Sequence, residues 1–547
     1  MPPTLAYFGR ISVAPARPVD SPLGWWMVLV PVAGCLIIGL MARYGSEKIR
    51  GHGIPEAMEA ILVGRSRIQP KVALLKPLSS AISIGSGGPF GAEGPIIMTG
   101  GAIGSLFAQL FHLTDAERKT LLVAGAAAGM RATFGTPVAA MLLAVELLLF
   151  EWKPRSFIPV AVAAAVAAAC RPALLGAGPL FPLADSAPLP ALGLLLCAVL
   201  GVLAGLGSGV LTRLVYGFED LFARLPLHWM WWPMIGGLAV GIGGLVDPRA
   251  LGVGYENIAA LLHAGMGMDD ALRLVVVKAL IWAIALGSGT SGGVLAPLLM
   301  MGGALGAVFG LTVPYGTPGD WALVGMAAMM GGTMRAPLTA MIFALELSHD
   351  MGALLPLAIA CTLSHGTTVL LLKRSILTEK VARRGHHIVR EYGVDPFDTL
   401  RVAQIMVRRV DTLANGMTLA DAAAFFLDGA DRHKSYPVVD QDGRVLGMAS
   451  RADALVWTRQ ANDGHTLADH CADSPLAAAY EDELVGAVAD RMADSGHGRL
   501  PVLDRDTGAL VGLVARRDLL AARAHGQRQE RGREALLRPG RRIKQGA

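Results

Sequence analysis

The chain of 547 residues is 53% hydrophobic and 17% charged, with a mean hydropathy of +0.49 and a formal net charge of +5. This composition excludes an ordinary soluble protein and predicts a polytopic membrane protein that becomes soluble after about residue 372. The small positive charge lies mostly in short loops and in the C-terminal tail, as is typical of cytoplasmic segments, so it does not indicate nucleic-acid binding.

The first 23 residues contain several prolines and no continuous apolar core. They therefore predict a cytoplasmic segment rather than a cleaved signal peptide. The five cysteines are scattered without the spacing of a metal site, which predicts buried inert thiols and no metal.

A first membrane helix is predicted at 24–43, with Trp25 and Trp26 as interfacial anchors. Further apolar segments follow at 71–84, 95–112, 121–151, 157–175, 188–216, 230–246, 271–286, 295–312, 321–347 and 353–372. Several are shorter than the roughly 20 residues that span a bilayer, and others are longer. The mixture predicts tilted and re-entrant helices, whose breaks are buried or line water.

The stretch from Gly85 to Ser105 contains a glycine-dense break with one carboxylate, Glu93. A helix predicted from Pro95 onward would present unpaired N–H groups and a partial positive charge at its start, which attract anions. Glu93 is then an anion that another anion can displace. The alternative is a helix-packing segment whose glutamate faces a water-filled vestibule.

This stretch recurs 202 residues later, where Gly287, Pro297 and Lys278 correspond to Gly85, Pro95 and Lys76. A second match, at a spacing of 200 residues, relates Glu146 in the first half to Glu346 in the second. The apolar region is therefore an internal duplication. Glycine- and proline-broken apolar segments in corresponding halves indicate a transport site.

The soluble region is also duplicated, because the segment 436–440 recurs at 500–504 and the segment 447–453 at 512–518. Each unit predicts a helix, two strands around a turn, and a second helix. The predicted organisation is a cytoplasmic segment at 1–23, a membrane domain at 24–380, a linker at 381–398, paired units at 399–460 and 461–525, and a basic disordered tail at 526–547. The tail is read as solvated, with contact to anionic lipid as the alternative.

Three motifs together resemble the CLC family of chloride channels and proton-coupled chloride transporters with a C-terminal CBS pair. GHGIP at 51–55 is similar to the family's GSGIP, GAEGP at 91–95 to GREGP, and GGVLAP at 292–297 to the GxFxP region. The resemblance implies an α-helical membrane domain with inverted repeats and broken helices, an α/β CBS pair on the cytoplasmic side of the inner membrane, and a homodimer with one anion path per subunit.

The resemblance also implies roles for individual residues. Glu93 corresponds to the gating glutamate, and the backbone N–H groups of Val294 and Leu295 to the central chloride site. His52 stands where the family often has a chloride-binding serine; it predicts a pH-sensitive anion position, or else a histidine that packs away from the path. The anion-binding set comprises His52, Gly53, Ile54, Gly91, Gly94, Val294, Leu295 and Leu377.

Several positions depart from the family pattern. Ala92 replaces an arginine beside the gate, Leu295 a phenylalanine, and Leu377 a tyrosine that touches chloride. Leu147 stands where proton-coupled members carry the second of two acids, which favours passive conduction, although water or Glu151 is an alternative proton carrier.

Four charged residues and three CBS residues complete the predicted site set. Glu146 and Glu346 are read mainly as structural helix-end carboxylates. Lys76 and Lys278 are expected to add positive potential near the anion path or to pair with these acids. In the CBS pair, Ser450, Asp453 and Asp518 resemble residues that hold the ribose of an adenine nucleotide, with a ligand-free dimerisation module as the alternative.

We therefore predict chloride or a similar anion as the transported partner, with protons as a possible second one, and no cofactor in the membrane domain. Channel-like conduction is slightly preferred, H⁺/Cl⁻ exchange is the alternative, and a nucleotide-sensing membrane receptor is a distant third. An enzyme is not expected, because the histidines are dispersed and no nucleophile–base arrangement is evident.

Overall fold

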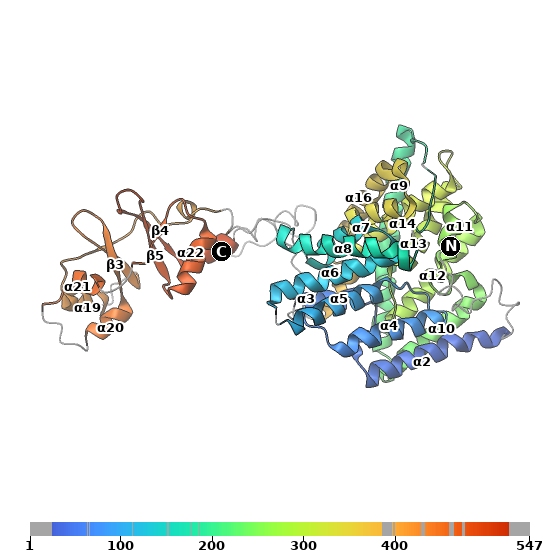
Figure 1. The fold of residues 1–547 in the computed structure, drawn as a ribbon, viewed down its shortest axis with the longest axis horizontal. Coiled ribbons are helices and arrows are strands. Elements are labelled where there is room, and N and C mark those ends of the chain that lie inside the picture. The colour runs from blue at the N-terminus through green and yellow to red at the C-terminus, as the bar shows by residue number, and fades with distance from the viewer. Residues whose placement is uncertain are drawn as a thin grey trace. The chain divides into compact units, whose positions relative to one another are not determined.

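The computed structural model describes residues 24–384, except 63, 65, 112, 150–151, 177 and 185, and then residues 397, 400–427, 433–458, 464–472 and 476–524. The chain divides into two compact units, residues 1–392 and 393–547 (Figure 1). The segment 1–23, residues 385–396 and 398 of the predicted linker, Glu151 and the tail at 526–547 lie outside the described residues.

In the part of the first unit that is described, the regular structure is helical. Its helices are α2 (Leu29–Tyr44), α3 (Ile54–Leu62), α4 (Pro70–Gly85), α5 (Glu93–Leu110), α6 (Asp115–Phe134), α7 (Pro137–Leu143), α8 (Pro154–Leu174), α9 (Ala191–Ala223), α10 (Trp232–Val246), α11 (Tyr255–Leu262), α12 (Met268–Gly287), α13 (Leu295–Gly310), α14 (Pro318–Met334), α15 (Pro337–Ser348), α16 (Leu354–Leu371) and α17 (Ile376–Arg383). Short 3-10 turns lie at Gly24–Val28 (η2), Glu47–Ile49 (η3), Trp229–Trp231 (η5), Pro248–Ala250 (η6) and Met351–Ala353 (η7), and a π-helix, η4, spans Ala144–Leu149.

Five helical stretches among the described residues are long and apolar enough to cross a membrane: Trp25–Tyr44, Pro154–Leu174, Ala191–Ala223, Trp229–Val246 and Met351–Arg383. Other apolar helices are shorter, for example α13 and α15. The mixture of long and short apolar helices is the one that the sequence predicts.

The predicted duplication is visible in the way the helices pack. α5 packs on α6 and α13 packs on α14 through matching glycines. A Cβ atom added at Gly100 would lie 2.2 Å from the carbonyl oxygen of Gly125, and one added at Gly302 would lie 2.5 Å from that of Gly325. Both helix pairs therefore approach so closely that only glycine fits at the crossing.

Two of the long apolar segments, 121–151 and 321–347, are each interrupted near the middle. α6 ends at Gly135 with a φ of +81°, and α14 ends at Arg335 with a φ of +58°. A left-handed residue ends a helix, and the prolines at 137 and 337 begin the next one. The first of these new helices continues into η4, which carries Glu146 and Leu147.

The second unit contains two similar α/β motifs, each with a three-stranded sheet. In the first motif, β1 pairs in parallel with β2 and β2 in antiparallel with β3, so that Tyr436 lies opposite Ala449. The second motif repeats this order with Leu500 opposite Val514. The elements are η8 (Val402–Gln404), β1 (Leu413–Ala414), α19 (Leu419–Leu427), β2 (Ser435–Val439), β3 (Val445–Ser450), α20 (Arg451–Trp457), α21 (Leu467–Ala472), β4 (Ala479–Tyr480), α22 (Val485–Asp494), β5 (Arg499–Leu503) and β6 (Leu510–Ala515).

Candidate functional site

Three glycine-rich loops, which precede α3, α5 and α13, meet inside the first unit. The N–H of Gly91 donates to the carbonyl of Gly293 at 3.1 Å, and the N–H of Gly293 donates to that of Gly91 at 2.7 Å. The N–H of Gly51 donates to the carbonyl of Thr290 at 3.2 Å. The starts of three helices from both repeats therefore gather at one place, where their N–H groups provide a partial positive charge.

Glu93 lies at the centre of this arrangement. It is only 1% exposed. Its carboxylate lies against two glycines, because a Cβ atom added at Gly91 would lie 1.8 Å from Oε2 and one added at Gly293 would lie 2.7 Å from it. The backbone N–H of Ala296, in the first turn of α13, faces the carboxylate. Oε2 has no hydrogen-bond partner among the described residues. The carboxylate of Glu93 thus fills the space beside the glycines of two loops.

A fourth glycine loop, at 252–254, belongs to the same site and was not predicted. It precedes α11, and the hydroxyl of Tyr255 donates to Oε1 of Glu93 at 3.4 Å. The sequence carries a signal for it, since Gly252 and Gly254 repeat Gly51 and Gly53 at one spacing of 201 residues. The four loops form two related pairs: the loop before α3 corresponds to that before α11, and the loop before α5 to that before α13.

Lys76 and Lys278 each hold one of the related loops. The ammonium of Lys76 donates to the carbonyls of Ile49 and Gly51 at 2.8 and 2.6 Å, and to Oγ of Ser291 at 3.1 Å. The ammonium of Lys278 donates to the carbonyls of Ala250 and Gly252 at 2.9 and 2.8 Å. These hydrogen bonds go to the loops rather than to Glu146 or Glu346.

His52 and Glu56 lie at the start of α3. His52 is 2% exposed, and its Nδ1 has no hydrogen-bond partner among the described residues. Oε2 of Glu56 accepts the N–H of Gly53 at 3.0 Å, while Oε1 contacts Lys380 Nζ and a guanidinium nitrogen of Arg384, both at 3.2 Å. Sequence reasoning did not identify Glu56, Lys380 or Arg384, because the two cations lie more than 300 residues beyond Glu56.

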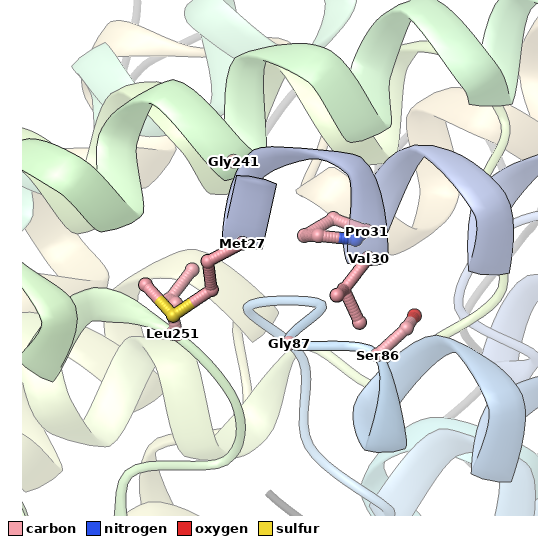
Figure 2. A pocket seen from close by; sticks show the side chains of 7 residues that line it. All are labelled: Met27, Val30, Pro31, Ser86, Gly87, Gly241 and Leu251. Atoms are coloured by element: carbon pink, nitrogen blue, oxygen red, sulfur yellow. The ribbon is translucent and has the colours of Figure 1, made fainter. Parts of the chain in front are cut away.

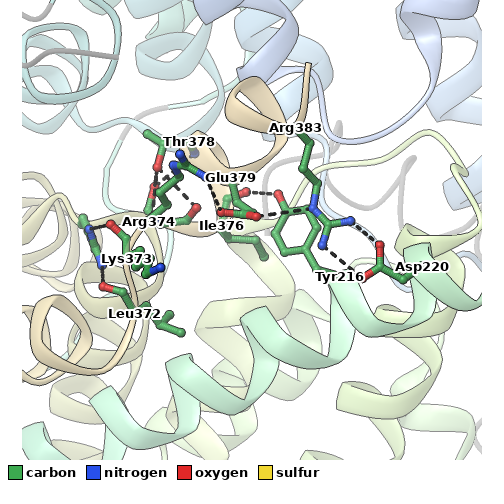
Figure 3. Close-up of polar contacts among 11 residues, drawn as sticks. Tyr216, Asp220, Leu372, Lys373, Arg374, Ile376, Thr378, Glu379 and Arg383 are labelled. Carbon is green, nitrogen blue, oxygen red and sulfur yellow. Dashed lines mark hydrogen bonds and ion pairs between the residues drawn. The ribbon is translucent and has the colours of Figure 1, made fainter. Parts of the chain in front are cut away.

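α17 is fixed against α9 by a second set of polar contacts, which Figure 3 shows. The guanidinium of Arg383 binds the carboxylate of Asp220 at 2.5 and 3.2 Å and lies over the ring of Tyr216 at 4.6 Å. The hydroxyl of Tyr216 donates to the carbonyl of Ile376, in the first turn of α17. The helix that precedes the second unit is therefore attached both to α9 and to the start of α3.

The remaining predicted site residues have simple surroundings. Ile54, Val294, Leu295 and Leu377 are fully buried at the starts of α3, α13 and α17, and Leu147 is fully buried within η4. Leu147 belongs to the hydrophobic core and provides no titratable group. Gly94, the residue after the gate candidate, contacts the carbonyl oxygen of His52, since an added Cβ atom would lie 1.8 Å from it.

A separate hollow lies beside the loop that follows α4 (Figure 2). It is lined by Met27, Val30, Pro31, Ser86, Gly87, Gly241 and Leu251. The lining side chains carry no charge, and Glu93 is not among them.

An open cleft lies between the two motifs of the second unit. Its lining includes two acids, Asp411 and Asp518, and the side chains of Arg409, His433, Arg499 and Arg517. Ser450 and Asp453 do not line this cleft. Instead, the carboxylate of Asp453 accepts the N–H and the hydroxyl of Ser450 at 2.9 and 2.6 Å and thereby caps α20.

Broken helices that bring four glycine loops to a buried carboxylate, inside a unit with five membrane-length helices, define a polytopic membrane protein. Residues 34–368 match the family model "Voltage gated chloride channel", and residues 402–458 and 468–525 match that of the CBS domain. The chain belongs to the CLC family of voltage-gated chloride channels and carries a C-terminal CBS pair. Members of this family are channels or transporters rather than enzymes.

Two curated relatives and one solved structure illustrate this membership. The chain is 30% identical over 393 residues to a putative chloride channel protein ClcB-like from Ralstonia nicotianae, covering 70% of this chain and 90% of the relative. It is 30% identical over 354 residues to the H⁺/Cl⁻ exchange transporter ClcA of Cronobacter sakazakii, covering 62% and 76%. A slow cyanobacterial Cl⁻/H⁺ antiporter has the same fold, with a TM-score of 0.61, 23% identity, and coverage of 70% of this chain and 92% of the antiporter.

Proposed function

We propose that this protein moves chloride across a membrane through a path that the carboxylate of Glu93 opens and closes. The observation that carries the proposal is the position of this carboxylate over Gly91 and Gly293, beside the first turn of α13, with Oε2 unpartnered among the described residues. The ionised carboxylate competes with chloride for the same N–H groups. When it is protonated, it loses its charge and leaves the position to the anion.

Chloride binds through backbone N–H groups and helix starts rather than through a full positive charge. The hydrogen bonds of Lys76 and Lys278 support this, because each ammonium already binds the carbonyls of a glycine loop. Both lysines therefore act at longer range. Anomalous scattering from bromide would test this, and an ion in direct contact with either ammonium would contradict it.

We further propose that conduction is passive or only weakly coupled to protons. An intramembrane proton route needs titratable groups, and Leu147 offers a buried hydrocarbon at the position associated with the inner route. Proton-coupled exchange is the second candidate, which the resemblance to a named H⁺/Cl⁻ exchange transporter supports.

The test is a flux assay in liposomes that records chloride and pH together. A chloride gradient should drive chloride movement with little or no uphill proton movement. Robust proton movement that Glu93→Ala abolishes would establish exchange and retain the gate. If liposomes with the protein show no more chloride flux than liposomes without it, the path itself is overturned.

We also propose that the CBS cleft binds an adenine nucleotide, with Asp518 toward the ribose and the basic lining toward phosphate. Three arginines, a histidine and two aspartates line this one cleft, and this lining supports the proposal. Calorimetry with ATP, ADP and AMP on the whole protein would test it, with Arg517→Ala as the variant expected to weaken binding. Absence of any binding heat would favour a ligand-free module.

The expected setting is the inner membrane, with the CBS pair on the cytoplasmic side and two copies of the chain in a dimer. Outward apolar side chains on neighbouring helices support a lipid- or partner-covered face: Val138, Ile158, Val162, Val166, Leu338 and Leu355 are each about half exposed in the single chain. Light scattering of the detergent-solubilised protein would give its mass and thus distinguish a dimer from a monomer.

A further inference from the structure

His52 is a buried ring without a partner for Nδ1 among the described residues, at one end of the proposed path. Its carbonyl oxygen packs directly against Gly94, the residue that follows Glu93. The imidazole therefore belongs to the loop that contacts the start of α5. Buried polar nitrogens in proteins almost always have a partner, so an unpartnered one beside a set of helix starts is a position for an ion or a water.

Each of the cationic side chains at this end of the path has an oxygen partner. The N–H of Gly53 is bound by Glu56, and the ammonium of Lys76 has three oxygen partners, which matches its three donors. Lys380 and Arg384 contact Glu56. Leu377 has no polar atom in its side chain. Among these groups, the imidazole of His52 is the one with an unused nitrogen.

The charges around His52 come from four helices. Glu56 faces it from α3, Lys76 from α4, and Lys380 and Arg384 from α17 and its end, while Glu93 begins α5 beside Gly94. Three cations and Glu56 thus surround the ring. A proton on the imidazole adds a further positive charge, which an anion beside the ring would compensate. Conversely, an anion at this position would favour the protonated ring, which donates from both nitrogens.

We propose that His52 takes up a proton when an anion binds at the α3 end of the path, so that this position binds an anion and a proton together. The proton comes from water and adds to a ring nitrogen, and no other bond changes. The inference rests on the proposed anion path and adds to it. In this inference His52 is a titratable group next to the anion. Leu147, at the position where proton-coupled members carry an acid, is not titratable.

Calorimetry that counts protons tests the proposal directly. The Glu93→Gln variant is used as background, because a glutamine cannot titrate and any uptake must arise elsewhere. Chloride is titrated at about pH 7 in two buffers with different ionisation heats, and the difference gives the protons bound per anion. We expect a fractional uptake in this variant and none in Glu93→Gln/His52→Ser, whose serine hydroxyl still donates a hydrogen bond. The chloride Kd of the first variant should rise with pH around neutrality by less than about tenfold per pH unit, in proportion to the uptake, while that of the second stays flat.

Two further results separate the possible failures. Chloride binding without proton uptake in Glu93→Gln, or equal uptake in both variants, overturns the role of His52 and leaves the anion path in place. Absence of chloride binding in both variants and of chloride flux in the wild type overturns the path and this inference with it. His52→Gln on the same background serves if the serine variant does not fold, and it too should bind chloride without proton uptake.

Discussion

Glu146 and Glu346 each cap the helix that carries the other. The carboxylate of Glu346, in α15, accepts the N–H groups of Val138 and Ala139 at the start of α7, at 3.0 and 2.9 Å. The carboxylate of Glu146, in the π-helix that continues α7, accepts those of Leu338 and Thr339 at the start of α15, at 3.4 and 2.8 Å. A negative charge at a helix start is stabilising, so this reciprocal pair holds the two repeats together.

Removing either charge should therefore destabilise the membrane unit. We expect Glu346→Gln and Glu146→Gln each to lower the stability by about 1–2 kcal/mol, because a charge-assisted hydrogen bond becomes a neutral one. Thermal denaturation in detergent measures the effect, with the exposed Asp490→Asn, in the middle of α22, as a control that should leave the transition of the membrane unit unchanged. A wild-type transition temperature in both variants would contradict the capping role.

The gate should make chloride flux depend on pH. Acid on the side that Glu93 faces should raise flux, because the protonated carboxylate no longer competes with the anion. Glu93→Gln should conduct constantly and lose most of this dependence. Chloride efflux from liposomes over a range of pH checks the expectation. Unchanged pH dependence in Glu93→Gln would remove Glu93 from the gate.

Tyr255 should stabilise the closed gate, since its hydroxyl donates to Oε1 of Glu93 at 3.4 Å. The bond is long, so its loss should cost about 0.5–1 kcal/mol and raise flux near neutral pH by about two- to fivefold. Tyr255→Phe tests this while keeping the aromatic ring that packs against Phe181. The increase should vanish in the Glu93→Gln background, and an increase that persists there would show that the hydroxyl acts elsewhere.

In the CBS pair, acid should weaken the second motif through Glu483. Its hydrogen bonds with Arg491, both 2.8 Å, lower the pKa of this carboxylate below its usual value. A carboxylate whose folded-state pKa is lowered contributes stability above its unfolded pKa, and the contribution disappears as the pH falls through the folded value. The side chain of Arg491 is 35% exposed, and the resulting solvent screening limits the gain to about 1 kcal/mol.

Hydrogen exchange on the whole protein measures this contribution, with protection factors corrected for the intrinsic effect of pH. Protection of α22 should fall in Arg491→Met at pH 7, and the difference from the wild type should vanish in acid. A difference that is the same at both pH values would exclude the ion pair as its cause.

The glycine and proline breaks were the parts of the membrane fold that the sequence predicted well. The breaks at 51–55, 85–95 and 287–297 do precede α3, α5 and α13, because glycine permits the close backbone approach seen at Gly91 and Gly293. The interruption at Arg335 was not predicted, since a left-handed arginine has no composition signal, and only the following proline marks the boundary.

Long-range partners could not be predicted in the same way. That Tyr255 reaches Glu93, or that Lys380 and Arg384 reach Glu56, depends on how distant helices pack, which periodicity does not encode. Asp453, by contrast, has a partner close to it in the sequence. A local pattern of serine and aspartate three residues apart is a capping box, and the structure uses both side chains in that way.

The contact between Lys76 and Ser291 bears on the order in which the protein can be completed during synthesis. The two residues are 215 positions apart in the chain, and the loop that the lysine holds also pairs with Thr290. At about 5–20 residues per second, the ribosome delivers Ser291 on the order of 10–40 s after Lys76. During that interval Lys76 lacks its partner Ser291, and the loop at Gly51 lacks its partner Thr290. The nascent N-terminal half is therefore in the membrane before its ion site is complete. Only the arrival of the second half closes it.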